Sequence, residues 1–430
     1  MSRDVVLFCL GFALLRFWAV LGRPPVRFND SPSYFQIDFL GHATRLWTVP
    51  VFYNALPNDS ARVLAQIVFG IVCWSALAFA VARSLRNSLV ARLGALLVLL
   101  LALCIQVTEW DQAILSESLA LSFTALLVAS LLWLRLRRST SAMVATLVVL
   151  VLWVFTRQLQ AILYVLVSLP LIAWILFRAR RHVRSYVLIA CALAALAVWS
   201  GYASDQARGI MRHNEYYLVT QRILPTPGGA EFFASHGMPD MPELVKAAAK
   251  GQPFEHSSVV RDPRWQAWSD SHWKQTYAEW LLHHPVADIR APLVDVPNLL
   301  SGFPDYTGST RVTLPSPVQD SLWERTSGDV PLWFALTLVI WLVSLRGSRP
   351  ERPRGKVPLS LGALGAGGVG FAALWYLAGW HLAAVELPRI SVEAAALLRI
   401  GLFLVLLDAL DRIVLRHLAV RHPRAGQRSS

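Results

Sequence analysis

The sequence predicts an all-α polytopic membrane protein with about ten transmembrane helices and a mainly helical outer domain inserted before the last three of them. Hydrophobic residues make up 55% of the 430 residues and charged residues 16%, whereas soluble domains are about one quarter charged. The apolar residues gather in runs of about 18–22, the length that crosses a hydrocarbon core of about 30 Å. The surplus of apolar side chains must therefore face lipid.

The spans can be placed directly from these runs. The first run has no small-residue cleavage site after it, so it is expected to be a retained span and not a removed signal peptide. The ninth contains the glycine-rich stretch GALGAGGVGFAAL, which favours close helix packing over a phosphate loop. The predicted spans are residues 4–22, 62–82, 89–107, 113–134, 141–157, 159–177, 184–203, 331–345, 358–379 and 394–411.

The charges predict how the chain is oriented. The net charge is +13, but its distribution argues for the positive-inside pattern and against a nucleic-acid binder. If the spans alternate, the basic clusters all fall on one side, which puts both termini in the cytoplasm of a multi-pass cell-membrane protein. These clusters lie within residues 83–92, 135–138, 178–184, 346–356 and 412–428.

Four parts follow from this topology. Residues 1–203 form an N-terminal transmembrane module with a first outer loop at 23–61. Residues 204–330 form an extracytoplasmic domain, which carries 11 Lys and Arg against 15 Asp and Glu. Residues 331–411 form the C-terminal transmembrane helices, and residues 412–430 form a basic cytoplasmic tail.

The outer domain contains one long amphipathic pattern, DPRWQAWSDSHWKQTYAEWLLHHP, which predicts a helix ending at Pro285. Its four tryptophans present either an aromatic surface for sugar rings and headgroups or a face that packs the domain onto the membrane. They are Trp265, Trp268, Trp273 and Trp280. All four cysteines fall inside apolar spans, so no disulfide framework is expected, and no zinc motif is present.

The first outer loop holds the most informative acid, Asp30, in the stretch RFNDSPSYFQI. An interfacial helix is expected over residues 31–45, with the apolar side chains Tyr34, Ile37, Phe39 and Leu40 toward lipid. A carboxylate at that depth suits a substrate whose reactive head protrudes from the bilayer while its tail stays inside. The alternative is a solvated aspartate that caps the following helix.

Three further groups of charged side chains lie near the ends of spans, where charge is costly and points to function. Glu117 is expected about one turn inside the fourth span; the alternative for it is a hydrogen-bonded structural role. Asp111 is expected at the outer end of the third span, where loop solvation is the alternative. Arg157, beside Gln158, either binds a phosphate or extends to headgroups. The fourth group, in VELPRISVEAAALLR, includes Arg389.

Together these residues suit a reaction between a phosphate-linked donor and a hydroxyl acceptor. The arginines would hold the phosphate and stabilise charge on the leaving oxygen. A carboxylate would accept the proton of the acceptor.

The order of motifs resembles a known family. DSPSY in the first loop, RLWTVPVFY, ILSESLALSF, FTRQLQAI and a late ELPRIS follow one another as they do in the GT-C class of polytopic glycosyltransferases. The resemblance is greatest to the branch that contains the protein mannosyltransferases and the lipid A aminoarabinose transferases. It covers residues 1–165 well and 380–400 loosely; Gln158 stands where proline is common in the family.

The resemblance implies a polyprenyl-phosphate sugar as donor and membrane lipids as surroundings, with a lipid, glycan or protein as acceptor. It implies Asp30 as catalytic base, Glu117 as second acid, and Arg157 and Arg389 as ligands of the donor phosphate. Tyr34, Asp111 and Gln158 complete the expected substrate-binding set. No cofactor is certain, and a divalent cation is left open because members of the class differ.

Two other functions compete with a glycosyltransferase. A transporter or flippase for lipid-linked sugars predicts charges deep in several spans or broken helices in matched halves; the two halves of this sequence do not mirror each other. A non-catalytic scaffold of the cell envelope would use the outer domain to bind partners.

Overall fold

The computed structural model describes residues 3–178, 183–206, 208–250, 254, 257–301, 307–308, 310–323, 328–345, 360–384 and 386–421. Within these ranges every regular element is helical, and an isolated β-bridge joins Val26 to Ala113. The predicted basic clusters at 346–356 and beyond residue 421, and Arg180 and Arg181, lie outside the described residues.

Each of the ten predicted spans overlaps a helix of at least 15 residues. In chain order the helices are α1 (Arg3–Val20), α3 (Asp59–Ser84), α4 (Ser88–Leu103), α6 (Glu117–Arg137), α7 (Thr140–Val154), α8 (Gln158–Arg178), α9 (Val183–Gln206), α17 (Asp329–Leu345), α18 (Leu361–Leu382) and α20 (Val392–Arg421). Of the described helices, α3, α6, α8, α9 and α18 are long and apolar enough to cross a bilayer. The structure is thus that of a helical membrane protein, and ten spans stay a prediction.

A sixth candidate span is broken. Helix α4 ends at Leu103, and the chain turns by 62° at Cys104 into two short helices, α5 (Ile105–Thr108) and η2 (Glu109–Gln112). The prediction of one continuous helix over 89–107 is therefore wrong at its end. The break carries residues 109–112 into the protein interior.

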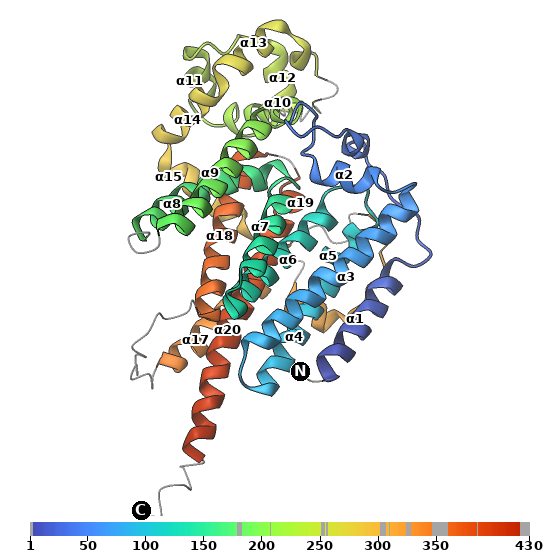
Figure 1. The fold of residues 1–430 in the computed structure, drawn as a ribbon. Coiled ribbons are helices and arrows are strands. Elements are labelled where there is room, and N and C mark those ends of the chain that lie inside the picture. The colour runs from blue at the N-terminus through green and yellow to red at the C-terminus, as the bar shows by residue number, and fades with distance from the viewer. Residues whose placement is uncertain are drawn as a thin grey trace, which may run out of the picture.

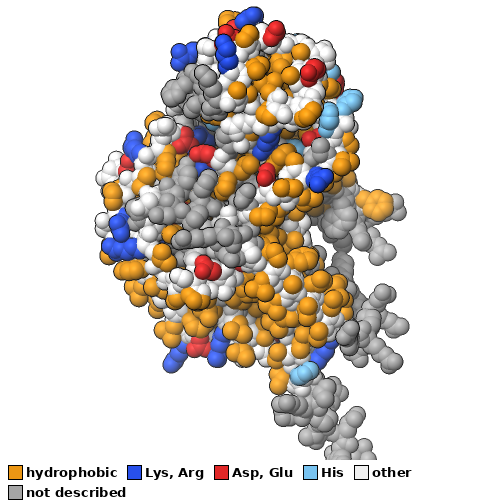
Figure 2. All heavy atoms as spheres, turned by 180° about the vertical axis from the view of Figure 1, so that it is seen from behind, with side chains coloured by type: hydrophobic (Ala, Val, Ile, Leu, Met, Phe, Trp, Pro, Cys, Tyr) orange, Lys and Arg blue, Asp and Glu red, His pale blue; other side chains and the backbone are white. Residues whose placement is uncertain are grey.

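The long helices pack side by side, with α3 against α4 and α6, α8 against α9, and α18 against α20 (Figure 1). Close packing of the last pair depends on small residues, as predicted. A Cβ added at Gly365 would lie 2.6 Å from the carbonyl oxygen of Gly401. On the face shown in Figure 2, hydrophobic side chains cover a broad area of the lower body, and charged ones gather at its lower rim and on the upper part.

The outer domain caps one end of this bundle, while α1 begins and α20 ends at the other (Figure 1). Its elements are α10 (Arg208–Leu218), the π-helix η4 (Val219–Ile223), α11 (Gly229–Ser235), α12 (Pro242–Lys250), η6 (Val259–Arg261), α13 (Pro263–Ser271), α14 (Trp273–His283) and the start of α15 (Pro285–Ser301). The last helix of the predicted domain, α16 (Ser316–Leu322), lies in the bundle instead, where the Ile105 backbone donates to Gln319 at 3.1 Å. Helix α15 leaves the cap and packs on α18 and α20, where Trp380 donates a hydrogen bond to Asp295 (2.9 Å).

Two predictions for the outer domain are wrong. The expected single amphipathic helix is two helices, α13 and α14, which meet at His272. Its four tryptophans are at most 6% exposed and pack with Phe233 and Tyr216 in the domain's own hydrophobic core. Most of their aromatic surface is used inside the domain, because a small helical cap needs large side chains to fill its centre.

The first outer loop also differs from the prediction. The expected helix over 31–45 is a short 3₁₀ turn, η1 (Ser31–Phe35), after which Gln36 is extended. Tyr34 is buried instead of facing lipid, whereas Ile37, Phe39 and Leu40 are exposed as expected. The loop continues into the short helix α2 (Thr48–Asn54).

Candidate functional site

Glu117 lies at the first residue of α6 and not one turn inside it. The preceding segment cannot be helical because it pairs with the first loop: Val26 donates to the Gln112 carbonyl, and Ile114 donates to the Val26 carbonyl, both at 2.9 Å. The carboxylate of Glu117 is nevertheless completely buried. It faces the C-terminal part of the chain across the bundle.

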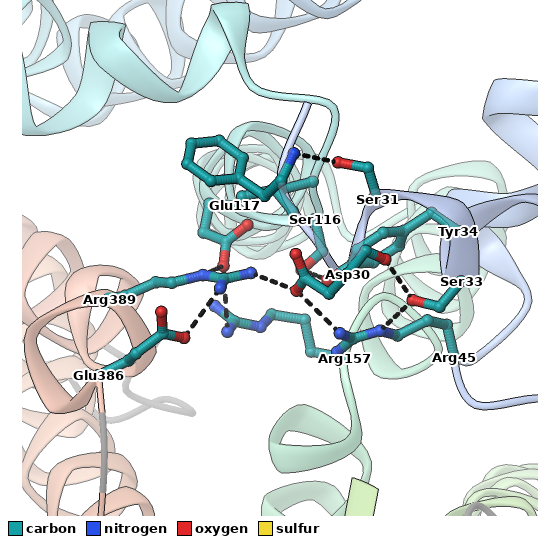
Figure 3. A network of polar contacts seen from close by, with 12 residues as sticks. Asp30, Ser31, Ser33, Tyr34, Arg45, Ser116, Glu117, Arg157, Glu386 and Arg389 are labelled. Atoms are coloured by element: carbon teal, nitrogen blue, oxygen red, sulfur yellow. Dashed lines mark hydrogen bonds and ion pairs between the residues drawn. The ribbon is translucent and has the colours of Figure 1, made fainter. Parts of the chain in front are cut away.

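Arg389 connects the predicted acids. It lies on α19 (Leu387–Ile390), a single turn between α18 and α20. Its guanidinium donates to Glu117 at 2.6 Å, to Asp30 at 2.9 Å and to Glu386 at 2.9 Å (Figure 3). Burial lowers the pKa of Arg389, but Glu117 and Asp30 raise it more, so that the net shift is upward. The guanidinium stays charged.

Asp30 is shared between two arginines. Besides Arg389, Arg45 donates to the same carboxylate oxygen at 2.9 Å, and it also donates to the hydroxyl of Ser33 (Figure 3). The Asp30 side chain makes no capping hydrogen bond to η1. The alternative reading of Asp30 as a helix cap is therefore wrong.

Arg157 forms the other side of the charged cluster. It precedes α8, lies 3.4 Å from Glu117 and donates a hydrogen bond to Glu393. Glu117 and Glu393 are both completely buried, whereas the Arg157 side chain is 15% exposed. The two glutamates thus hold the arginine from behind and leave it open toward the front.

Tyr34 lies beneath the guanidinium of Arg45, which is 4.5 Å from the ring centre. Its hydroxyl hydrogen-bonds the Ser116 hydroxyl at 3.2 Å. Burial raises the pKa of Tyr34, partly offset by Arg45. The phenol is therefore a neutral hydrogen-bonding group next to Asp30.

A cavity of about 780 Å³ opens in front of these residues. Asp30, Tyr34, Arg157, Gln158 and Arg389 all line it, so the structure brings together five of the seven predicted site residues. Glu117 lies directly behind Arg389. The first loop, α8, α18, α19 and the outer-domain helices α10 and α14 all contribute to the wall.

Asp111 is the predicted site residue that lies elsewhere. It is fully buried, accepts two hydrogen bonds from Arg16 (2.8 and 2.9 Å) and one from Ser118 (2.7 Å), and does not line the cavity. Loop solvation is also wrong as an explanation, since the bend after α4 carries Asp111 inward. Its position fits a structural role in place of substrate binding.

Sequence reasoning missed several residues that line the cavity. Arg45 follows Asp30 by only 15 positions in the same loop. An acidic and a basic side chain so close in one short loop are a usable signal of an ion pair at the site. Ser204, Asn214 and Glu215 had no such signal, because the end of α9 and the start of the outer domain reach the cavity only through the path of the folded chain.

In the part of the chain that the structure describes, no group of three His, Cys, Asp or Glu side chains is arranged to hold a metal ion. Arg389 occupies the space between Asp30, Glu117 and Glu386. The divalent cation stays an untested expectation. No protein-family model matches the chain, and no curated protein sequence matches it.

Proposed function

We propose that the protein is a membrane glycosyltransferase that moves a sugar from a polyprenyl phosphate to an acceptor on the outer face of the cytoplasmic membrane. The carrying observation is the meeting of Asp30, Arg157 and Arg389, from three distant parts of the chain, at one cavity. This cavity lies between apolar helices and the outer domain, where a lipid-borne headgroup would be reached from the membrane.

The arginines suit the phosphate. Arg45, Arg157 and Arg389 line the cavity. Four carboxylates pair with them: Asp30 and Glu386 also line the cavity, and Glu117 and Glu393 are buried behind the arginines. One guanidinium group can donate two parallel hydrogen bonds to two oxygens of a phosphate. Glu386 is the most exposed of the partners of Arg389, at 46%, and is the carboxylate that an incoming phosphate would displace at least cost.

The remainder of the wall suits the lipid. Leu159 and Ile162 of α8 and Leu382 of α18 line the cavity, and both helices are candidate spans. An isoprenoid chain entering from the bilayer would contact these apolar side chains with its first units. The phosphate would then reach the arginines at the ends of the same helices.

The reaction is a single inverting displacement. The acceptor oxygen attacks the anomeric carbon, and the bond from that carbon to the phosphate oxygen breaks. The electron pair leaves with the polyprenyl phosphate, whose added charge Arg157 and Arg389 stabilise. Asp30 takes the acceptor's proton as general base, and Glu117 holds Arg389 in position.

The transporter alternative finds little support in the described residues. Charged pairs do lie between helices, Arg16 with Asp111 and Arg399 with Asp329, but both are completely buried and bonded to each other. Neither pair lines the cavity. They join helices and do not form a path for a substrate.

Asp30→Asn tests the proposal. Transfer of radiolabelled sugar from polyprenyl phosphate to membrane extracts should fall by about 10²–10⁴-fold, the usual contribution of a general base. Asp38→Asn is the matched control: it changes a half-buried aspartate of the same loop that does not line the cavity, and it keeps the oxygen that accepts from Leu40 and Gly41. Undiminished transfer by Asp30→Asn would refute the assignment, and a wild-type protein without transfer would favour a scaffold.

A further inference from the structure

The cavity has two chemically different halves. The charged half consists of Asp30, Arg45, Arg157, Glu386 and Arg389. The outer half consists of Ser204 at the end of α9, Asn214, Glu215 and Tyr217 of α10, and Trp273 and Tyr277 of α14. Helices α10 and α14 lie above α19 in Figure 1, so the outer half is the roof of the cavity. The proposed reaction uses only the charged half.

The roof contains polar atoms that no described residue satisfies. The Ser204 hydroxyl is buried without a hydrogen-bond partner, and so is the amide nitrogen of Gln158, where the two halves meet. The half-buried side chain of Asn214 lines the same space. Buried polar groups are costly unless they are hydrogen-bonded, so the Ser204 hydroxyl and the Gln158 amide point to a ligand that carries hydroxyl groups.

The charges of the roof favour a neutral ligand over an acidic one. No lysine or arginine among the described residues lines the outer half. The nearby Arg212 and Lys274 form ion pairs with Asp270 and Asp205 instead. The acid in the roof, Glu215, is 6% exposed and accepts a hydrogen bond from Ser269. Glu215 therefore offers no positive charge to an anion.

The side wall is aromatic. The rings of Trp273 and Tyr277 are stacked with an interplanar angle of 8° and a centre distance of 5.0 Å. The Tyr277 hydroxyl donates to the His381 carbonyl (3.0 Å), which fixes the wall to the end of α18. A rigid aromatic wall next to unsatisfied amide and hydroxyl groups is the combination that suits the apolar face and hydroxyl edge of a sugar ring.

We infer that the outer half of the cavity is the acceptor subsite and that it takes a neutral, polyhydroxylated group, a glycan without acidic sugars, held by Gln158, Ser204, Asn214 and Glu215. This inference rests on the proposed function, because the acceptor meets the donor where the two halves join. Its hydroxyl would then point toward Asp30 on the opposite wall.

Binding of plain sugars tests this subsite without an activity assay. Saturation-transfer NMR on the full chain in nanodiscs would compare neutral gluco-, manno- and galacto-trisaccharides with a galacturonic acid trisaccharide. At least one neutral trisaccharide should give a signal five or more times that of the acidic one. Ser204→Val/Asn214→Leu should reduce that signal at least fivefold. Ser200→Val, a matched change one turn earlier on α9, should not, because Ser200 donates to Ala197 and does not line the cavity.

Three results would overturn the inference: no neutral sugar binds the wild type, the acidic sugar binds equally well, or the double variant binds as the wild type does. Binding of polyprenyl phosphate, measured by native mass spectrometry, separates this failure from failure of the proposed function. The double variant should keep that binding within twofold, whereas Arg389→Gln should weaken it at least tenfold. If Arg389→Gln binds the lipid as tightly as the wild type, the proposed function fails whatever the sugar result.

Discussion

Arg16 with Asp111 and Arg389 with Asp30 are the same kinds of side chains in two different surroundings. The first pair is completely buried, doubly bonded and without contact to the cavity. In the second pair Asp30 is 27% exposed, is shared by two arginines and faces open space.

The difference shows why charge inside a helical bundle is an incomplete guide to function. The enclosed pair ties α1 to η2 and so supports the bend that leads into α6. The open pair has room for a ligand, and a phosphate or a hydroxyl can replace one of its partners. A binding site is distinguished by its access to a ligand and by partners that a ligand can replace. An enclosed pair has neither, and we call such a structural pair a brace.

Breaking the enclosed pair should have the largest effect. Asp111→Ala leaves the Arg16 guanidinium buried without its carboxylate, which should cost about 3–5 kcal/mol in the free energy of unfolding. Arg16→Met/Asp111→Leu should recover most of this loss, because both charges are removed together. Thermal unfolding in detergent, followed by tryptophan fluorescence, measures both. A single variant as stable as the wild type would mean that the pair is not a brace.

Glu215 extends the comparison to a buried acid whose direct partner is a hydroxyl, that of Ser269, and not an arginine. Burial raises its pKa to about 7 from 4.5, with Asp270 raising it further and Arg212 and Lys274 lowering it. The folded protein therefore holds this proton more tightly than the unfolded chain does. Its contribution to stability is complete below about pH 4.5 and is lost as the pH rises to about 7, by about 3 kcal/mol at most.

The same pH range provides the control. Glu215→Gln cannot ionise, so its stability should fall less than that of the wild type between pH 4.5 and 7. Chemical unfolding at several pH values measures the difference. Parallel pH profiles for the two proteins would show that Glu215 is not buried as described.

Substituting one arginine of each kind tests the distinction between site and brace. Arg389→Gln should weaken polyprenyl phosphate binding by about 10–100-fold, or about 1.4–2.7 kcal/mol, because a charge-assisted contact to the phosphate is lost. Arg399→Gln removes a guanidinium that is completely buried and bonded twice to Asp329, and should reduce stability more than binding. The two assays are native mass spectrometry and thermal unfolding. If both variants lose lipid binding and stability in the same proportion, Arg389 and Arg399 do not have different roles.

The smallest effect on stability is expected from an exposed ion pair. Arg27 donates twice to Asp59, but its side chain is 54% exposed. Arg27→Gln should change the free energy of unfolding by less than about 1 kcal/mol, since water and salt screen such pairs. A loss comparable to that of Asp111→Ala would remove burial as the explanation of the difference.

The helices could be predicted because the length of an apolar run is a local property. The meeting of Asp30 and Arg389 followed from the order of motifs and not from any local pattern. Glu117 was placed one turn too deep, because the backbone pairing of Val26 with residues 112–114 is a contact across the fold. Asp111 was assigned to the site for the same reason: its partner, Arg16, is 95 residues away.

The outer domain shows a second limit of the sequence. The spacing of its tryptophans is equally compatible with an exposed face and with a core, and only the packing of α13 and α14 against Phe233 decides between them. Ser204 and Asn214 are ordinary residues in sequence. They become candidates through their place in the wall and, for Ser204, through a buried hydroxyl without a hydrogen-bond partner.

The most direct test is a cryo-EM structure of the protein in nanodiscs that contain polyprenyl phosphate. We expect phosphate density in the cavity within about 3 Å of the guanidinium nitrogens of Arg389 and Arg157. The isoprenoid should run along α8 and α18, and the Asp30 carboxylate should face the outer half. Lipid density confined to the outer surface of the bundle, with these arginines still bonded only to their carboxylates, would contradict the account.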